Sequence, residues 1–465
     1  MKRILNEETI KCLGKKVKVC GWVNSIRSHG KIIFIDLRDG SGILQAVFTP
    51  EKKSLYEESQ TLKPEWVVCL EGKVKERPKG MHNPKVKTGK VELEVEDLIV
   101  LNQSKTPPFE ITSDTKAVKE EIRLKYRYLD LRTERMRKNL IFRHKVIKYI
   151  RGFMDKNGFI EIETPILTKS TPEGARDFII PSRLHPGKFY ALPQSPQQYK
   201  QLLQIAGFEK YFQIAKCLRD EDPRADRQAE HTQLDVEMSF VEQEDILSLI
   251  EELYVKLVKS LTPQKKITKI PFPRLDYDKT MKQYGTDKPD LRKNPKNPDE
   301  LAFCWILNWP LFEWNKDEKR YDSMHHIFTL PQEKDIPLLN KNPLKVHSWQ
   351  HDLVLNGSEI GGGSIRINNR EIQEKIFKLI GLDKKEAQKK FGHLLKAFDY
   401  GAPPEGGIAL GIERLLSHLA NEDNIREVMA FPKTGDGWDP LMDSPSEISQ
   451  EQLKELHIKI FKPKK

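Results

Sequence analysis

Residues 212–240 have the sequence FQIAKCLRDEDPRADRQAEHTQLDVEMSF, and the fold of most of the chain can be predicted outward from them. Two apolar, strand-like arms flank a loop that is rich in polar and charged residues, among them Arg219, Asp220, Glu221 and Gln228. Arginines at the ends of sheet strands suit phosphate binding, because a guanidinium group meets two oxygens at once. Taken alone, a charged hairpin loop is more often an ordinary solvated turn.

Two further segments have the same mixed character. A helix is predicted from about Lys138, and Asn157-Gly158 ends it; the strand FIEIETPIL (159–167) follows. Near the C-terminus, GGIALGIERLLSHL (406–419) reads as a glycine-rich strand that leads into a helix with Arg414 in its first turn. Strands and helices alternate here without a βαβ repeat, which favours an α+β domain on an antiparallel sheet with flanking helices.

The first hundred residues predict a separate unit made of strands. In KVELEVEDLIVL (90–101) apolar side chains alternate with glutamates, which is typical of a strand with one buried face. Four more β-rich segments precede it: VKVCGWVN (17–24), IIFIDL (32–37), ILQAVF (43–48) and WVVCLEGKV (66–74). Residues 1–105 also carry more than half of the net charge of +11. A basic five-stranded barrel of OB type is predicted, a fold whose open face commonly binds single-stranded nucleic acid.

Length and composition exclude several classes of protein. A chain of 465 residues predicts two or three domains, and 38% hydrophobic residues exclude a disordered or fibrous chain. No apolar run approaches the ~20 residues of a membrane-spanning helix, and the N-terminus does not read as a secretory signal. Five widely spaced cysteines predict neither a disulfide framework nor a metal site, which is typical of a reducing, cytoplasmic location.

In this order, the three segments resemble motifs 1, 2 and 3 of the class II aminoacyl-tRNA synthetases. The sequence between them sharpens the match to the aspartyl-tRNA synthetases of bacterial type over nearly the whole chain. The matching motifs are TPEGARD (171–177), LPQSPQQYKQLL (192–203), RDEDPRADRQ (219–228), MHH (324–326), NGSEIGGGSIRI (356–367), GIER (411–414) and AFPKT (430–434).

The resemblance implies a domain division and one departure from it. We expect an anticodon-binding barrel over 1–105, a hinge over 106–137 and a catalytic domain over 138–465. Bacterial relatives carry an inserted domain between motifs 2 and 3, whereas here only a short linker over 292–301 follows YGTDKPDLR (284–292). The helix of motif 1 forms the dimer interface in relatives, so a homodimer is expected.

The resemblance also implies a pocket for L-aspartate. Lys200 and Arg366 are expected to clamp the side-chain carboxylate with charge-assisted hydrogen bonds, and to reject asparagine because its amide offers donors to the same cations. The ammonium group and the pocket wall are assigned to Glu173, Ser195, Gln197, Asp235, His325 and His326. A histidine pair is more often structural or metal-binding, but no other ligands cluster near this one in the sequence, which favours the pocket interpretation.

ATP and magnesium complete the implied site. Arg219 binds the α-phosphate and Arg414 lies near the γ-phosphate; together with Glu221 they form the predicted catalytic set. The remaining ATP-binding positions are Asp220, Gln228, Glu359, Gly411, Ile412 and Glu413. Asp352 and Glu359 match the family's Mg²⁺ carboxylates, since hard oxygen ligands suit that ion. The α-carboxylate of aspartate attacks the α-phosphorus, and the tRNA 3′-hydroxyl then takes the aspartyl group without a protein nucleophile.

The barrel is expected to read the anticodon. By family position, Phe34 stacks on an unpaired base, while Arg27, Gln45 and Glu92 contact base edges. From the residues alone, Phe34 is equally a core side chain between two isoleucines.

Two loop residues bear on the choice of tRNA. His29 and Gly80 match the pair in family members that charge both tRNA-Asp and tRNA-Asn, so a non-discriminating enzyme is predicted. The alternative is a discriminating enzyme that charges tRNA-Asp only. Within the class, an asparaginyl enzyme is the nearest alternative, and Lys200 favours aspartate. A paralogue that makes a free amide or dipeptide and a non-catalytic nucleic-acid-binding protein are alternatives of other classes.

Overall fold

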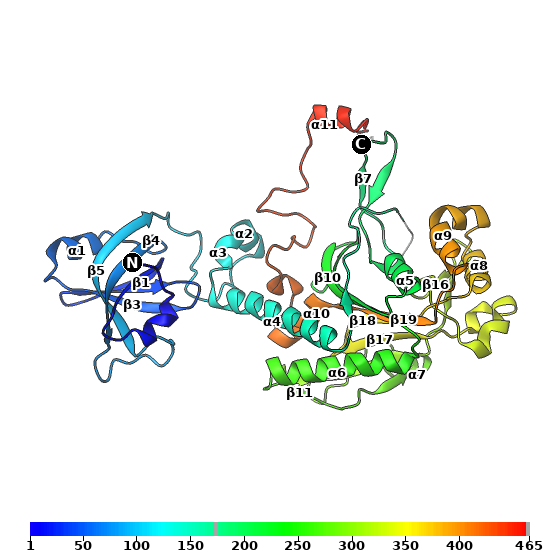
Figure 1. The fold of residues 1–465 in the computed structure, drawn as a ribbon, viewed down its shortest axis with the longest axis horizontal. Coiled ribbons are helices and arrows are strands. Elements are labelled where there is room, and N and C mark those ends of the chain that lie inside the picture. The colour runs from blue at the N-terminus through cyan, green and yellow to red at the C-terminus, as the bar shows by residue number, and fades with distance from the viewer. Residues whose placement is uncertain (171–173, 462–465) are drawn as a thin grey trace. The chain divides into compact units, whose positions relative to one another are not determined.

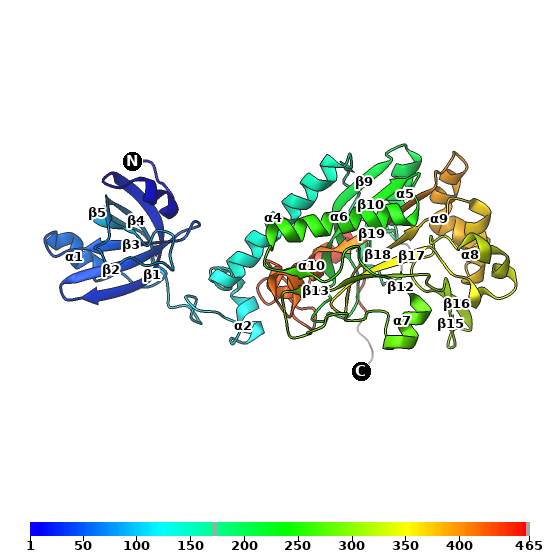
Figure 2. The same cartoon turned by 90° about the horizontal axis from the view of Figure 1, so that it is seen from below.

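The computed structural model describes residues 1–170 and 174–461, which belong to two compact units, Met1–Ala117 and Val118–Lys465 (Figures 1 and 2). The boundary between the units falls inside the predicted hinge, 106–137. Part of that stretch is helical and belongs to the second unit, as α2 (Glu120–Lys125) and α3 (Arg127–Asp130). In the part of the chain that the structure describes, no helix has the length and apolar character that crossing a membrane requires.

The first unit is a closed five-stranded barrel with the strand order β1-β2-β3-β5-β4. Its strands are β1 (Lys16–His29), β2 (Ile32–Arg38), β3 (Ile43–Phe48), β4 (Val67–Glu76) and β5 (Val91–Asn102), with the short helices η1 (Asn6–Lys11) and α1 (Lys53–Ser59). All five strands predicted for the barrel are therefore confirmed. Val19, Ile35, Leu44 and Leu93 are completely buried inside the barrel, because alternate residues of each strand face its interior.

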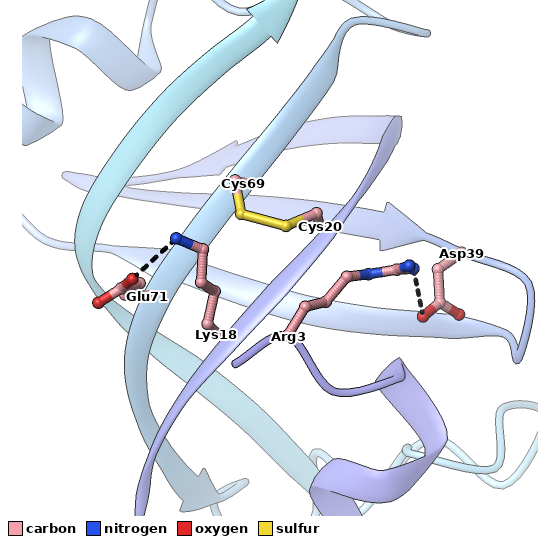
Figure 3. Close-up of a disulfide and its surroundings, with 6 residues drawn as sticks. All are labelled: Arg3, Lys18, Cys20, Asp39, Cys69 and Glu71. Atoms are coloured by element: carbon pink, nitrogen blue, oxygen red, sulfur yellow. Dashed lines mark ion pairs between the residues drawn. A yellow bond between two sulfur atoms is a disulfide. The ribbon is translucent and has the colours of Figure 1, made fainter. Parts of the chain in front are cut away.

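One expectation about the barrel is wrong, because a disulfide joins Cys20 to Cys69 (Figure 3). The two cysteines lie 49 residues apart in the sequence but directly opposite each other in the antiparallel pair of β1 and β4. Spacing along the chain carries no information about such a cross-strand partner. Beside the disulfide, Lys18 and Glu71 form another cross-strand pair, with Nζ 3.2 Å from Oε1.

The second unit is built on an eight-stranded sheet with the order β12-β14-β17-β18-β19-β10-β9-β6. The strands are β6 (Ile160–Glu161), β9 (Lys210–Leu218), β10 (Glu230–Ser239), β12 (Arg274–Asp276), β14 (Phe303–Leu307), β17 (Gln350–Leu355), β18 (Ser358–Ile365) and β19 (Glu405–Gly411). The six strands from β14 to β9 are antiparallel to their neighbours, as predicted, and the two outermost strands pair in parallel. The predicted hairpin over 212–240 is confirmed as β9 and β10.

Two long helices pack side by side against the sheet, α4 (Glu134–Lys156) and α6 (Gln243–Leu261) (Figures 1 and 2). Helix α4 begins four residues before the predicted start, because the side chain of Thr133 caps it by accepting a hydrogen bond from the Met136 N–H. The strand predicted over 159–167 pairs only at Ile160–Glu161, so that prediction was too long.

Shorter elements surround the sheet. The helices are α5 (Gln197–Ile205), α7 (Tyr277–Tyr284), α8 (Arg370–Leu379), α9 (Lys384–Phe398), α10 (Ile412–Ala420) and α11 (Gln450–Glu455), with the 3₁₀ turns η2 (Glu333–Asn340), η3 (Pro343–Lys345) and η4 (Ile425–Val428). Small two-stranded sheets are formed by β7 (Ile179–Pro181) with β8 (Phe189–Ala191), β11 (Lys266–Ile267) with β13 (Glu300–Leu301), and β15 (Phe312–Asn315) with β16 (Arg320–Ser323).

A buried cluster of charges joins the short helices α2 and α3, which precede α4, to η4. Asp130 is completely buried and accepts from Arg127 at 2.5 Å, while Arg123 lies 3.2 Å from the same carboxylate oxygen and also pairs with Glu427. Removing one member of a buried ion pair leaves an uncompensated charge, which costs more than the pair itself contributes.

We therefore expect Asp130→Ala to lower the free energy of unfolding by about 3–5 kcal/mol, measured by urea denaturation followed by circular dichroism. Lys138→Ala is the control, because it removes an exposed ion pair with Glu134 on the surface of α4 and should change stability by at most about 0.5 kcal/mol. Equal effects of the two substitutions would contradict this interpretation of the cluster.

Candidate active site

A cavity of about 330 Å³ lies over the centre of the large sheet. The hairpin of β9 and β10, the strands β18 and β19, and the starts of α5 and α10 all contribute to its lining. Most of the predicted site residues line it: Ser195, Gln197, Lys200, Arg219, Glu221, Gln228, Asp235, His325, His326, Glu359, Arg366, Gly411, Glu413 and Arg414. Glu173 falls outside the residues that the structure describes.

Two buried cations lie at the deep end of the cavity and share one carboxylate. The Lys200 ammonium is 2.7 Å from Asp235 Oδ1 and 3.0 Å from Glu237 Oε2. Arg366 donates to the same glutamate through Nε, at 2.8 Å, and Nη2, at 3.1 Å. All four side chains are almost fully buried. Burial opposes ionisation of Glu237, but Arg366 and Lys200 outweigh this effect and hold the pKa of Glu237 below its ordinary value.

Glu237 is a site residue that the sequence interpretation missed. In β10, Leu234, Val236 and Met238 alternate with Asp235 and Glu237, and both acidic side chains lie on the cavity side of the sheet. This alternation was visible in the sequence. The position of Glu237, two residues after Asp235, could therefore have predicted a second carboxylate on the same face of the strand. Its partners could not be predicted, because they come from distant elements.

A third buried carboxyl group lies behind this pair. Glu405 begins β19, and its backbone carbonyl accepts a hydrogen bond from the Arg366 N–H at 2.9 Å. Burial, together with the negative charge of Glu237, raises the pKa of Glu405 well above its ordinary value. Its Oε1 accepts from Gln201 at 3.3 Å, whereas Oε2 is buried with no hydrogen-bond partner in the described structure. Its surroundings therefore favour the protonated form of Glu405.

The two histidines form an uncharged wall beside the cations. His326 Nε2 lies 2.5 Å from Arg366 Nη1, and because a guanidinium group only donates, Nδ1 carries the ring proton and lies 3.3 Å from Thr329 Oγ1. Burial and the charge of Arg366 lower the pKa of His326 well below its ordinary value, and burial lowers the pKa of His325 to about 4. Both rings are thus neutral near pH 7, and His326 accepts a hydrogen bond from the guanidinium group.

The two predicted phosphate-binding arginines come from different elements. Arg219 follows β9, and its Nε donates to the Gln194 carbonyl at 3.4 Å. Arg414, in the first turn of α10, donates to the Glu359 carbonyl at 2.7 Å and to the Asp226 carbonyl at 3.1 Å. Arg414 therefore connects the loop of the β9–β10 hairpin to strand β18.

Two residues of the hairpin supply flat polar groups to the same part of the cavity. Gln228 accepts a hydrogen bond from the Lys433 N–H at 3.1 Å, while its Nε2 is buried without a partner in the described structure. His231 was not among the predicted residues. Burial, with the positive charges of Arg219 and Arg414, lowers its pKa to about 3, so the ring is neutral. The sequence offered no signal for it beyond its position in the hairpin.

Three of the predicted ATP positions have other principal contacts. Glu413 lines the cavity, but its carboxylate accepts from Arg143 at 2.7 Å. Asp220 is exposed and lies near Arg176, with 3.8 Å between Oδ2 and Nε. Ile412 belongs to the hydrophobic core.

The carboxylates predicted to bind magnesium come from neighbouring strands. Asp352 in β17 lies opposite Gly362 of β18, the strand that also carries Glu359. Burial and the nearby Glu359 raise the pKa of Asp352 well above its ordinary value, so a cation between the two groups would be stabilised. A Cβ atom at Gly362 would lie 2.8 Å from Asp352 Oδ1 and 3.0 Å from His325 Nε2, which explains why only glycine fits there.

This donor set fits a hard divalent ion that shares its ligands with a nucleotide. Two carboxylates supply oxygen, and phosphate oxygens and water supply the rest. Among the described residues, no group of three or more His, Cys, Asp and Glu side chains is arranged to hold a metal ion alone.

The predicted anticodon residues lie together on the outer surface of the barrel. Arg27 donates to Asp36 at 2.9 Å and to Gln45 at 3.3 Å, and Gln45 donates to Glu92 at 2.8 Å. Phe34 pairs with Arg27 across β1 and β2 and is half-buried, whereas its two isoleucine neighbours point into the barrel core. This arrangement favours the surface interpretation of Phe34 over the core one.

The two loop residues lie apart from the buried core. His29 ends β1 and is exposed; Gly80 lies between β4 and β5 and is also exposed. Gly80 has φ +90, a conformation that favours glycine.

Comparison with known families shows to which family this chain belongs. Residues 119–435 match the model described as "tRNA synthetases class II (D, K and N)", and residues 17–101 match the OB-fold nucleic acid binding domain of the anticodon-binding type. The chain belongs to the class II tRNA synthetases of the D, K and N group. It is thus an aminoacyl-tRNA synthetase, a ligase with an OB-fold domain, as the sequence motifs predicted.

Relatives with assigned names are similar over nearly the whole chain. A protein of Rubrobacter xylanophilus named "Aspartate--tRNA(Asp/Asn) ligase" is 44% identical, over 97% of this chain and 95% of its own length. A protein of Dictyoglomus turgidum with the same name is also 44% identical, over 98% of both chains. The first alignment runs over 574 positions, more than the 465 residues of this synthetase, so long segments of the relative have no counterpart here.

Solved structures support the fold. Asparaginyl-tRNA synthetase from Pyrococcus horikoshii, complexed with asparaginyl-adenylate, has a TM-score of 0.76 at 24% identity and covers 93% of this synthetase and 98% of its own chain. An aspartyl-tRNA synthetase from Entamoeba histolytica has a TM-score of 0.71 at 22% identity, over 93% and 91% of the two chains. In this synthetase, only residues 285–299 separate α7 from β13, as expected where an inserted domain is missing.

The raised pKa of Glu405 predicts how stability depends on pH. A carboxyl group whose pKa is raised in the folded state binds a proton more tightly there than in the unfolded chain, so its contribution to stability falls as pH rises above about 4.3. Glu405→Gln mimics the protonated acid and offers a donor near the unpartnered oxygen of Gln201. We expect the variant to gain about 1–3 kcal/mol relative to the wild type between pH 5 and pH 8.

Urea denaturation at several pH values measures this difference. Glu209→Gln is the control, because Glu209 is an exposed glutamate of the second unit, directly before β9. A stability difference between Glu405→Gln and the wild type that stays constant over this pH range would show that Glu405 is ionised.

Proposed function

We propose that this synthetase activates L-aspartate with ATP and transfers it to the 3′ end of tRNA-Asp and tRNA-Asn, as a non-discriminating aspartate–tRNA ligase. Relatives that are 41–44% identical over almost their full length bear the name of this activity. The observation that carries the proposal is the buried pair of cations, Lys200 and Arg366, held on either side of Glu237 at the deep end of the cavity.

The cation pair is suited to a substrate carboxylate. Lys200 and Arg366 offer several N–H donors in a nearly dry pocket, where a carboxylate is bound strongly and a neutral amide is disfavoured because its own donors face the cations. Asp235 lies 2.7 Å from Lys200 and lines the cavity, so it is placed to accept from the substrate ammonium group. Ser195 and Gln197 line the same end, and Glu173 is proposed to complete it.

The ATP phosphates would lie between Arg219 and Arg414. Arg219 is proposed to bind the α-phosphate, and Arg414 the γ-phosphate, so that both neutralise charge as pyrophosphate leaves. Asp352 and Glu359 would hold Mg²⁺, which neutralises phosphate charge when bound. The unpartnered Nε2 of Gln228 is available to the adenosine part. Catalysis then depends on orientation and electrostatics, because attack by the substrate carboxylate requires no protein nucleophile.

The role of Glu237 tests the aspartate pocket. Glu237→Gln removes the charge that aligns both cations, and we expect kcat/KM for aspartate to fall about a hundredfold or more while KM for ATP changes little. The measurement is aspartate-dependent exchange of pyrophosphate into ATP. Glu230→Gln on the same strand loses only an exposed pair with Lys216 and should retain activity. An equal loss of aspartate and ATP binding would indicate a general structural defect instead.

The barrel supports recognition of an unpaired anticodon. Phe34 offers a half-buried aromatic face, and the adjoining ladder from Arg27 through Gln45 to Glu92 offers donors and acceptors to base edges. His29 and Gly80 are proposed to admit the third anticodon base of both tRNAs. A discriminating enzyme that charges tRNA-Asp only is the alternative.

Aminoacylation of separate tRNA-Asp and tRNA-Asn transcripts with labelled aspartate tests this part. We expect the wild type to charge both, and the double variant His29→Leu with Gly80→Lys to lose tRNA-Asn charging by about tenfold or more while keeping tRNA-Asp. Gly14→Lys is the matched control, since Gly14 is an exposed barrel glycine with a similar φ of +78. Unchanged charging of tRNA-Asn by the double variant would remove the assignment of these residues.

We further propose a cytoplasmic location and a division into an anticodon-binding domain (1–105), a hinge (106–137) and a catalytic domain (138–465). We also propose a homodimer formed through the motif 1 helix α4. Ile141 of α4 is 42% exposed, as suits a helix with a further partner.

A further inference from the structure

The segment between α7 and β13 contains a lysine that the mechanism above does not use. Gly285 ends α7 in the left-handed conformation, with φ +69, and turns the chain towards β17 and β18. Asp290 packs against the tight turn that joins these two strands. A Cβ atom placed on Gly357, in that turn, would lie 3.5 Å from the Cβ atom of Asp290. An ion pair between Asp290 and Arg292, at 2.7 Å, holds the segment in this conformation.

Lys288 projects from this segment onto one of the proposed magnesium ligands. Its Nζ lies 3.5 Å from Glu359 Oε2. The same oxygen is 3.9 Å from Nη1 of Arg414. Glu359 therefore separates Lys288 from an arginine that is proposed to bind the γ-phosphate, and the lysine lies next to the phosphate end of the cavity.

The Lys288 side chain is free to exchange partners. It is 42% exposed, and Glu359 is 31% exposed, so their contact is not locked inside the protein. When Glu359 ligates a divalent ion, its charge is no longer available to the lysine, whereas the β- and γ-phosphates bring new negative charge to the same place. An ammonium group on a flexible four-carbon stem binds phosphate oxygens as a point charge, without the fixed geometry of a guanidinium group.

We infer that Lys288 is an additional phosphate-binding residue of the ATP site, which neutralises Glu359 in the empty enzyme and moves to the β- and γ-phosphates when MgATP binds. This inference rests on the proposed function, because it assumes that ATP occupies the cavity. In the reaction, the bond between the α-phosphorus and the bridging oxygen breaks, and the electron pair leaves with pyrophosphate. Lys288 stabilises that developing charge and takes no part in proton transfer.

The inference predicts that Lys288→Met weakens nucleotide binding but strengthens the binding of Mg²⁺. Affinity for MgATP and for pyrophosphate should fall about tenfold, since one charge-assisted contact is lost. Less Mg²⁺ should be needed for half-maximal activity at saturating ATP, because the lysine no longer competes with Mg²⁺ for Glu359. KM for aspartate should stay unchanged. Lys288→Arg keeps the charge and should restore most of the affinity.

The measurements are isothermal titration of the purified full-length protein with MgATP in the absence of aspartate, and aspartate-dependent pyrophosphate exchange at varied Mg²⁺. Lys293→Met is the matched control, because it removes an exposed lysine from the same segment. If Lys288→Met and Lys293→Met bind MgATP with the same affinity, the inference is overturned, and Lys288 only forms an ion pair with Glu359. Absence of aspartate-dependent exchange in the wild type would instead remove the proposed function, so the two failures are distinguishable.

Discussion

The arrangement of the active site depends on one buried carboxylate between two buried cations. Lys200, from α5, and Arg366, just beyond β18, would repel each other in a nearly dry interior, and Glu237 of β10 compensates both. This contact fixes a helix and two strands relative to one another. It also depends on Gly407, because a Cβ atom there would lie 2.1 Å from Glu237 Oε2. The glycine-rich sequence of β19 is therefore a requirement of the charge network as well as of the sheet.

The balance of charge explains the preference for an acidic amino acid. The positive charges of Lys200 and Arg366 face Glu237 and hold its pKa below the ordinary value, while burial raises the pKa values of Asp235 and Glu405. The ammonium group and the α-carboxylate are common to aspartate and asparagine. The side-chain carboxylate of aspartate would bring a negative charge to the two cations, whereas asparagine would bring an uncharged amide whose donors face them. Discrimination against asparagine thus follows from the whole network and not from a single contact.

The sequence predicted the features that depend on local patterns, and missed those that depend on contacts between distant strands. The β9–β10 hairpin and the five barrel strands were predictable from alternation and turn residues, and the residues of the cavity from motifs. Glu237 was predictable in principle, since it follows Asp235 at the strand period. The Cys20–Cys69 disulfide was not, because it depends on the register of β1 and β4. Lys288 lies in the motif YGTDKPDLR (284–292), but only the packing of this segment on the β17–β18 turn relates it to Glu359.

Strand β18 relates the two halves of the chemistry to each other. Glu359 lies at its beginning and Arg366 directly after its end, so the strand runs from the proposed metal and phosphate end of the cavity to the proposed amino-acid end. Seven residues of extended chain span about 23 Å. Between these ends, Gly361 and Gly362 line the cavity without side chains, and Gly362 allows the close approach of Asp352 and His325. In the proposed reaction, the substrate carboxylate and the α-phosphorus would meet over this part of the strand. A rigid strand in the middle of a sheet therefore sets the distance between the two binding sites, which is what a reaction that depends on orientation requires.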